Sequence, residues 1–310
     1  MRKVAIIGVG NVGSTVAYTL FTHGTASEIL LFDHKAKKID AENRDLRDAV
    51  ARNHFPVTVK KMDWDNDQDW EELKNTDLIV TAFGDIGATA RTGSRQAELE
   101  MNTRGAREIG AKIKNSGFGG ILLNITNPCD VIVTILQKET GLPVNHVLGT
   151  GTFLDTSRMK RFVGEELGID PHNVHGYVLA EHGAEQFTAW STVFAAGQKA
   201  DELFSKEQEE EISAKPNKSS KLVSKGKGYT NWAISSTAYR LIEDIFADAH
   251  AVVPVSNYDK NYGVYLSWPV VLGSNGIERR AVLHLNEDEN AKYENAARAI
   301  KERLEKAERF

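Results

Sequence analysis

Residues 4–21, VAIIGVGNVGSTVAYTLF, decide the fold of the first half of the chain. Residues 4–7 are apolar and predict a buried strand, and residues 12–22 predict the helix that follows it. Between them, Gly8, Gly10 and Gly13 stand in the order GVGNVG, where the strand passes into the helix. That context is the one that a dinucleotide-binding fingerprint requires.

Each part of this turn has a physical task. Gly8 permits the tight turn, Gly10 lets the backbone approach a pyrophosphate, and Gly13 allows the helix to pack closely on the strand. Asn11 and Val12 open the helix, whose N-terminus offers N–H groups and a positive dipole end to phosphates. We therefore expect these five residues to bind a dinucleotide.

An acidic residue stands where the fingerprint needs one. Asp33 follows a second predicted strand, residues 28–32, and lies 20 positions beyond Gly13. Taken alone, it reads as a turn residue or a helix N-cap. In register with the strand, the glycines and the helix, its carboxylate is expected to accept hydrogen bonds from the adenosine ribose. It would repel a 2′-phosphate, which favours NAD over NADP, although the lysines at 35, 37 and 38 act against that preference.

The fold class follows from the order of predicted elements. Strands alternate with helices up to about residue 147, which indicates a Rossmann-type, doubly wound parallel sheet domain over residues 1–147. Its further elements are a helix at 36–52, strands at 77–82 and 120–125, and a helix from 128 to 138. Beyond it we expect an α+β substrate domain with antiparallel strands over residues 148–310, packed closely on the first.

The second half has the following predicted elements. Helices are expected at 152–167, 228–249 and 287–307, with a charged, solvent-facing helix at 206–225; strands are expected at 174–179 and 188–196, with two or three more between 252 and 285.

Composition excludes several classes of protein. The chain has 310 residues, 41% hydrophobic and 26% charged, which is ordinary for a globular protein. Its net charge of −5 argues against nucleic acid as a partner. No apolar run approaches the ~20 residues of a membrane span, and glycines interrupt the N-terminal run too early for a signal peptide. One cysteine, Cys129, excludes an internal disulfide and a cysteine-based zinc site, and the histidines lack metal-ligand spacing. We expect a reducing cytoplasm and no metal.

Two further segments carry groups suited to chemistry. Asp155 and Arg158 lie three apart on one face of a predicted helix, a spacing that also suits a surface ion pair contributing ~0.2–0.5 kcal/mol. His182 stands between Glu181 and Gly183 at the end of an apolar strand, where little side chain crowds its approach. An isolated histidine is more often a satisfied structural residue than a catalytic one.

Five motifs together resolve these alternatives. They are GVGNVG, TNPCD at 126–130, LDxxR at 154–158, EHG at 181–183 and KGYTNWAI at 227–234. In this order and spacing the chain resembles the L-lactate/L-malate dehydrogenase family over essentially its whole length. Within that family we expect it to stand nearest the L-2-hydroxyisocaproate dehydrogenases.

The resemblance implies a role for each reactive group. His182 is expected to be the general acid/base, which donates a proton to the 2-keto oxygen as hydride arrives from nicotinamide C4. Asp155 would hold the imidazole in the useful tautomer, and Arg158 would bind the substrate carboxylate as a bidentate pair.

Other positions are implied to line the substrate and cofactor. Asn127 would bond the substrate oxygen, with a helix N-cap as the alternative, and would also contact the cofactor. Thr230 and Ile234 would flank the substrate and the nicotinamide, although Ile234 also suits a core position. Thr81 and Ala82, which end a strand, are expected to contact the cofactor.

Two residues depart from the family pattern. Ala184 stands where the family commonly has an acidic or amide residue, so any supporting role of that side chain is missing. Cys129 replaces an aliphatic residue and is expected to pack as a small hydrophobe.

Residues 81–96, TAFGDIGATARTGSRQ, resemble the family's lid over the substrate. Arg95 aligns with the lid arginine that polarises the carbonyl once closure has expelled water. The residue six before it is Thr89, neither the arginine of malate dehydrogenases nor the glutamine of lactate dehydrogenases. Residues 86–90 are small or apolar, which favours a branched aliphatic substrate over a dicarboxylate. Arg91 is then expected to face solvent, with a substitute carboxylate clamp as the alternative.

The sequence therefore predicts an NAD-dependent L-2-hydroxyacid dehydrogenase for medium-chain or branched 2-keto acids such as 2-ketoisocaproate. L-lactate or L-malate dehydrogenase is the alternative within the family. A non-catalytic nucleotide-binding or structural protein, and an RNA-binding role, are the competitors from other classes. The resemblance implies a homodimer or a homotetramer.

Overall fold

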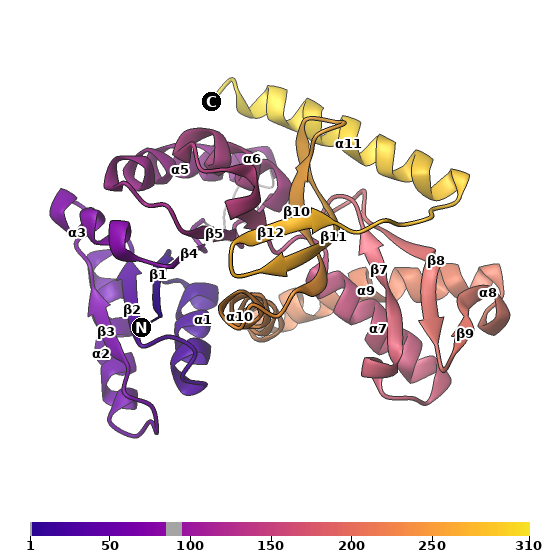
Figure 1. Cartoon of the computed structure of the whole chain (residues 1–310), viewed down its shortest axis with the longest axis horizontal. Helices are drawn as coiled ribbons and strands as arrows, with labels where there is room; N and C mark the ends of the chain where they lie inside the picture. The colour runs from indigo at the N-terminus through magenta and orange to yellow at the C-terminus, as the bar shows by residue number, and fades with distance from the viewer. Residues whose placement is uncertain (1, 85–94) are drawn as a thin grey trace.

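Parallel strands alternate with helices in the first half of the chain (Figure 1). The computed structural model describes residues 2–84 and 95–310, and the side chain of Arg95 lies outside that description. The strands are β1 Lys3–Ile7, β2 Glu28–Phe32, β3 Thr58–Lys61, β4 Leu78–Thr81, β5 Ile121–Asn124 and β6 Val147–Gly149. The helices are α1 Asn11–Thr22, α2 Ala36–Val50, α3 Asp67–Glu71, α5 Arg95–Ser116 and α6 Cys129–Thr140.

The second half adds a smaller sheet and extends the first one. Its helices are α7 Phe153–Leu167, α8 Ala200–Leu203, α9 Lys206–Lys227, α10 Trp232–Phe246 and α11 Glu287–Ala307. Its strands are β7 Val174–Leu179, β8 Phe187–Ala195, β9 Gln198–Lys199, β10 Ala251–Asp259, β11 Val264–Gly273 and β12 Gly276–Arg280. The strands β7, β8 and β9 form a separate antiparallel sheet.

The large sheet positions the site. Among the described residues it has nine strands in the order β12-β11-β10-β6-β5-β4-β1-β2-β3. The strands from β6 to β3 are parallel. The order of the strands reverses between β4 and β1, and open α/β sheets form a crevice at such a point, at the carboxyl ends of the strands. β10, β11 and β12 pair antiparallel, and β10 meets β6 through Ser256 and Gly149. The predicted fold class is confirmed.

Successive side chains of a strand point to opposite faces of the sheet, and both faces are covered by helices. The strands therefore appear in the sequence as continuous apolar runs. In β1, Val4 and Ile6 join the core on one face of the sheet, while Ala5 and Ile7 join the core on the other. The first face is covered by α1, α2 and α10, and the second by α5, α6 and α11. In Figure 1, α11 accordingly lies over α5 and α6, and α10 lies beside α1. Both faces are buried, so neither needs polar residues.

Two expected helices differ from the structure. The helix expected at 228–249 begins only at Trp232, because Gly228 ends α9 in the left-handed conformation with φ 83°. The charged segment 206–225 is helical in α9, but it is not wholly solvent-facing. Glu209, Ile212 and Pro216 are buried, and Ile212 joins a third core with α7, β7 and β8.

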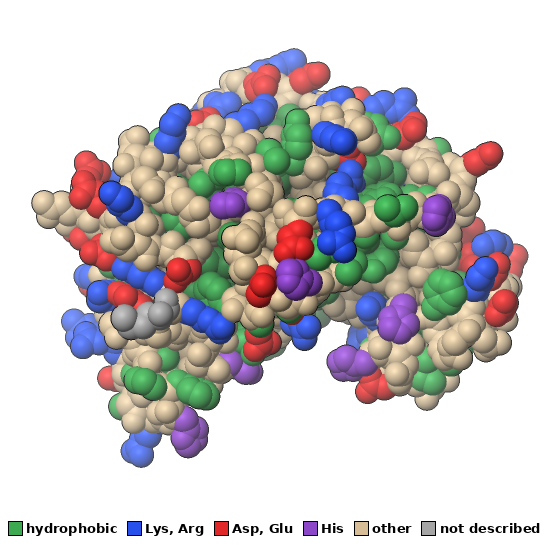
Figure 2. Space-filling model, viewed as in Figure 1, with side chains coloured by type: hydrophobic (Ala, Val, Ile, Leu, Met, Phe, Trp, Pro, Cys, Tyr) green, Lys and Arg blue, Asp and Glu red, His purple; other side chains and the backbone are tan. Residues whose placement is uncertain are grey.

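The surface carries charges of both signs. Figure 2 shows acidic and basic side chains interspersed over the face in view. No helix in the described part of the chain is both long and apolar enough to cross a membrane.

Candidate functional site

A pocket of about 550 Å³ lies outside the carboxyl ends of β1, β4 and β5. Both halves of the chain line it, so the nucleotide fingerprint and the predicted reactive groups meet in one space. The lining residues that carry the argument are Gly10, Asn11, Val12, Ala82, Asn127, Arg158, His182, Thr230 and Ile234.

His182 is held in this pocket by a buried carboxylate. Its Nδ1 lies 2.6 Å from Oδ2 of Asp155, whose Oδ1 accepts a hydrogen bond of 2.9 Å from Arg158. The Asp155 side chain is only 3% exposed, and that of Arg158 is 16% exposed. The Asp155–Arg158 pair is therefore no surface ion pair, and that alternative is wrong.

Charges around the imidazole set its protonation. Burial by itself lowers the pKa of His182, but the carboxylates of Asp155 and Asp130 outweigh it and raise that pKa above its ordinary value. Burial raises the pKa of Asp155, yet His182 and Arg158 outweigh it and hold that pKa below its ordinary value. Both shifts favour the state in which a protonated imidazole lies beside an ionised carboxylate.

The geometry leaves one ring nitrogen for chemistry. When Nδ1–H donates to Asp155, the tautomer is fixed and Nε2 of His182 is the remaining proton carrier. The His182 side chain is 27% exposed and lines the pocket, so a molecule bound there can reach it. This arrangement can give a proton to an oxygen or take one from it.

The glycine turn fits a dinucleotide phosphate. Gly8 has φ +99°, and an added Cβ there would lie 2.5 Å from the Phe83 nitrogen; at Gly13 it would lie 1.9 Å from the Gly8 oxygen. At Gly10 an added Cβ would meet nothing within 4 Å, which leaves room for a ligand to approach the backbone. No side chain caps the N-terminus of α1, so its first N–H groups are available to a phosphate.

Asp33 has a structural task as well. Its Oδ2 accepts the Val9 N–H at 2.8 Å and its Oδ1 accepts the Lys35 N–H at 2.9 Å, which ties the glycine turn to the end of β2. A carboxylate accepts further hydrogen bonds, so ribose hydroxyls can still bind it. Asp33 lies outside the pocket lining.

The remaining predicted residues divide into two groups. Ala82, Asn127, Thr230 and Ile234 line the pocket. Thr81 is fully buried and its hydroxyl donates to Asn124 Oδ1 at 2.9 Å, so its side chain does not reach the pocket. Pro128, not Asn127, caps α6, and the N-cap alternative for Asn127 is wrong.

Several predictions concern the segment before α5. α5 is described from Arg95 onward, and the GSRQ motif therefore adjoins this helix as predicted. Arg91, Thr89, the apolar residues 86–90 and the Arg95 side chain lie outside the described residues. The assignments made to them stay predictions.

Sequence reasoning missed two contacts that hold His182. Its main-chain N–H donates to Oδ2 of Asp130 at 2.8 Å, although the two residues are 52 positions apart. Glu181, only 4% exposed, forms an ion pair with Arg303 of α11. The TNPCD and EHG motifs contain Asp130 and Glu181, but no local spacing tells which distant segment they contact.

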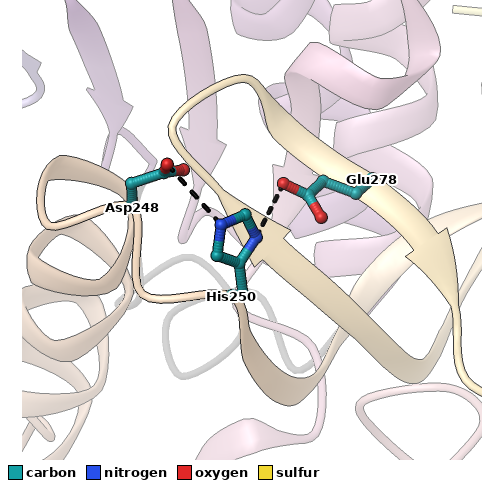
Figure 3. Close-up of side chains that lie close together, drawn as sticks. All are labelled: Asp248, His250 and Glu278. Atoms are coloured by element: carbon teal, nitrogen blue, oxygen red, sulfur yellow. Dashed lines mark ion pairs between the residues drawn. The ribbon is translucent and has the colours of Figure 1, made fainter.

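Away from the pocket, Asp248, His250 and Glu278 gather on the surface (Figure 3). His250 Nδ1 lies 2.9 Å from Glu278 Oε1, while its Nε2 lies 3.6 Å from Asp248 Oδ2. The imidazole thus bridges two carboxylates through different nitrogens, so the three side chains would have to rearrange to share one ion. We assign no metal here, and the absence of a metal stays a prediction.

Comparisons with known proteins now bear on this site. Residues 2–149 match the family model of the lactate/malate dehydrogenase NAD binding domain, and residues 152–310 match that of the lactate/malate dehydrogenase alpha/beta C-terminal domain. The chain belongs to the lactate/malate dehydrogenase family. The match to an NAD-binding domain confirms NAD as the cofactor of this family member.

Relatives and solved structures agree with this family. L-lactate dehydrogenase 1 of Bifidobacterium longum is 37% identical over 98% of this chain and 97% of its own length. L-lactate dehydrogenase 2 of Bacillus cereus is 32% identical over 98% of both chains. The structure of a minor L-lactate dehydrogenase from Enterococcus mundtii superposes with a TM-score of 0.90 at 29% identity, over 98% of both chains.

These names bear on the substrate prediction. The named relatives of this dehydrogenase are L-lactate dehydrogenases, and none of them supports a special closeness to L-2-hydroxyisocaproate dehydrogenases. They favour the alternative of a lactate or malate dehydrogenase over the branched-chain reading.

Proposed function

We propose that the protein is an NAD-dependent L-2-hydroxyacid dehydrogenase whose preferred substrates are pyruvate and L-lactate. One observation carries the chemistry: His182 and Arg158, both held by the buried Asp155, line the same pocket as the N-terminus of α1. The names of the relatives support lactate as the substrate.

His182 is the proton donor and acceptor of this reaction. NAD supplies the hydride transfer when it is bound. As the 2-keto carbon accepts hydride, Nε2–H of His182 gives its proton to the keto oxygen, and in the reverse direction neutral Nε2 removes the hydroxyl proton. Asp155 stabilises the imidazolium and holds its tautomer.

Arg158 anchors the substrate. One of its N–H groups donates to Asp155, and the guanidinium keeps other donors for a bidentate pair with the substrate carboxylate. Asn127 and Thr230 flank the substrate from the pocket wall, and Ile234 keeps water from the nicotinamide ring. We assign Arg95 to polarising the carbonyl.

The lining favours a monocarboxylate. Arg158 is the one lysine or arginine among the described residues that line the pocket. A second substrate carboxylate would therefore need a cation from outside the described lining, where Arg91 remains the candidate. A carboxylate buried without a partner is costly, so we place oxaloacetate last.

Branched 2-keto acids such as 2-ketoisocaproate are the second candidate. Small and apolar residues at 86–90, in the segment that resembles the lid, favour them. We also propose a boundary between the NAD-binding and substrate domains at residues 147/148, a homodimer or homotetramer in solution, and a cytoplasmic location.

Parallel assays of NADH oxidation at 340 nm with pyruvate, 2-ketoisocaproate and oxaloacetate test the proposal. The highest kcat/KM is expected with pyruvate. A clear preference for 2-ketoisocaproate would support the second candidate, and a preference for oxaloacetate would indicate that Arg91 clamps a second carboxylate. Absence of NADH oxidation with all three would contradict the proposed function.

A further inference from the structure

Asp130 joins three segments behind the reactive histidine. It is the second residue of α6, and its carboxylate is buried, with the residue only 1% exposed. Its Oδ2 accepts the main-chain N–H of His182 at 2.8 Å, and its Oδ1 accepts the hydroxyl of Ser256, in β10, at 2.5 Å. The position of His182 thus depends on a side chain that lies outside the pocket lining.

The two hydrogen bonds alone do not require a charge. An asparagine amide has the same shape: its oxygen can accept the His182 N–H, and its NH₂ can donate to the Ser256 hydroxyl. A buried carboxylate costs several kcal/mol in solvation, which its hydrogen bonds and the N-terminal dipole of α6 offset only in part. Burial accordingly raises the pKa of Asp130, against the opposing effects of Ser256 and His182. The hydrogen bonds that hold the chain therefore do not explain why a carboxyl group, and not an amide, occupies this position.

A reason for the carboxyl group is found at the imidazole. Among the described residues, the charged groups that act on His182 are Asp155 and Arg158 from α7 and Asp130 from α6. Asp155 also pairs with Arg158, whose positive charge opposes part of its effect on the imidazole, so Asp155 raises the His182 pKa most and Asp130 adds to it. Within the part of the chain that the structure describes, no lysine or arginine pairs with Asp130. In its ionised form it therefore places an uncompensated negative charge beside His182, which favours the imidazolium.

We propose that Asp130 is a positioning residue of the reaction, which fixes the main chain of His182 and, together with Asp155, supplies negative charge that favours the imidazolium. This inference rests on the proposed function. Its effect is exerted through His182, because the Asp130 carboxylate is buried behind the histidine main chain and its hydrogen bonds go to His182 and Ser256. The neighbouring Glu181 is paired with Arg303 and adds little net charge.

The inference separates activity from stability. The raised pKa of Asp130 means that its protonated form stabilises the fold at low pH, and that this contribution is lost as pH rises through the folded-state pKa. The ionised form of Asp130 is therefore less favourable to the fold than the protonated form. Asp130→Asn is expected to keep or raise the thermal midpoint while it lowers turnover, whereas a merely structural carboxylate would lower both together.

The test compares Asp130→Asn with a matched buried carboxylate. Asp244→Asn is the control: Asp244 is 3% exposed, pairs with Arg240, and lies ten residues beyond Ile234 on α10, roughly 15 Å along the helix. For both variants we would measure kcat and KM for 2-keto acid reduction between pH 5 and 10, the affinity for NADH, and the thermal midpoint. This range covers the span of about pH 5–8 in which histidines usually titrate and extends it on the alkaline side, because the pKa of His182 is raised.

For Asp130→Asn we expect the alkaline limb of kcat for reduction to move to lower pH, and kcat at neutral pH to fall about 10- to 100-fold. NADH affinity and KM are expected to stay within about threefold, because no substrate contact is lost. Asp244→Asn is expected to lower the thermal midpoint and leave the pH profile in place. An unmoved pH limb in Asp130→Asn, or a loss of turnover that merely follows a loss of thermal stability, would overturn the inference.

A second measurement does not depend on activity. The His182 imidazole can be titrated by NMR in histidine-labelled protein, with His182→Asn used to assign its signals. A lower His182 pKa in Asp130→Asn would support the inference even if no 2-keto acid were reduced. An unchanged His182 pKa would refute it, while NADH oxidation by the wild type would be left as separate support for the proposed function.

Discussion

Replacing Asp155 by asparagine tests the core of the site. In the folded protein Asp155 accepts hydrogen bonds from two groups that carry or can carry positive charge, His182 at 2.6 Å and Arg158 at 2.9 Å. The amide of Asp155→Asn keeps the shape of the carboxylate but not its charge. Its NH₂ group can face Nδ1 of His182, where the carboxylate accepts the Nδ1–H. That contact favours the other tautomer of His182, which carries its proton on Nε2 and none on Nδ1.

The size of the loss follows from these contacts. A hydrogen bond to a charged group contributes roughly 1.5–3 kcal/mol. Loss of one corresponds to about a 10- to 100-fold fall in kcat/KM, and loss of both to about 10²- to 10⁴-fold, at 1.36 kcal/mol per factor of ten. The His182 contact is expected to appear in kcat and the Arg158 contact in KM for the 2-keto acid.

The pH profile carries a second signature. Because the pKa of His182 is raised mainly by Asp155 against the effect of burial, reduction is expected to fall as pH rises through that raised value. In Asp155→Asn the same fall should begin at lower pH. Protonated His182 stabilises the fold at pH values below its unfolded-state pKa, and this contribution is lost as pH rises through the folded-state pKa. Asp155→Asn should therefore also reduce the stability of the fold at low pH.

The chain offers a matched control for this experiment. Asp170 and His172 form a pair of the same two groups, also 2.6 Å apart, but their side chains are 63% and 94% exposed. Asp170→Asn should leave kcat/KM within about twofold, because exposed pairs contribute little. NADH oxidation and thermal unfolding would be followed for both variants. If folded Asp155→Asn kept kcat/KM within tenfold of wild type and an unmoved pH profile, the reasoning about the pair would be refuted.

Three further predictions concern substrate and cofactor. Arg158→Lys is expected to raise KM for the 2-keto acid about 10- to 100-fold with a smaller change in kcat, since an ammonium cannot form the bidentate pair; an unchanged KM would contradict the anchor. Gly13→Ala should lower the thermal midpoint, because its Cβ would lie 1.9 Å from the Gly8 oxygen, whereas Gly10→Ala should keep the midpoint and weaken NADH binding in fluorescence titrations; equal effects would show that the two glycines have the same task. Asp33→Ala is expected to reduce the preference for NADH over NADPH in kcat/KM and to lower the midpoint, because two backbone N–H groups lose their acceptor; retention of a strong NADH preference would refute its contact with the ribose.

Local patterns in the sequence were sufficient for most of the sheet. The apolar runs at β1 and β2 and the glycines between β1 and α1 predict the turn that the structure contains, because each depends on neighbours within a few residues. The short strand β3 was not predicted: only Val59 of its four residues is buried, so no apolar run marks it.

Long-range contacts were beyond the same reasoning. Asp155 and Arg158 could be placed on one helix face, but the contact of Asp155 with His182 depends on the segment after β7. The hydrogen bond from His182 to Asp130 joins segments 52 positions apart, and no spacing within TNPCD or EHG encodes it. Thr81 ends a strand as predicted. Its hydroxyl, however, donates a hydrogen bond to the buried side chain of Asn124 on the neighbouring strand β5 and does not point into the pocket.

The continuous sheet has a consequence for dissecting the chain. Because β10 hydrogen-bonds to β6, and α10 shares a core with α1 and α2, cutting after residue 149 would bare an open strand edge and strip a helix from one face. A fragment ending there is therefore expected to aggregate when expressed alone, despite carrying the whole glycine fingerprint. Anyone grafting this cofactor-binding unit onto another protein would have to carry α10 and β10 with it, or supply a substitute for both.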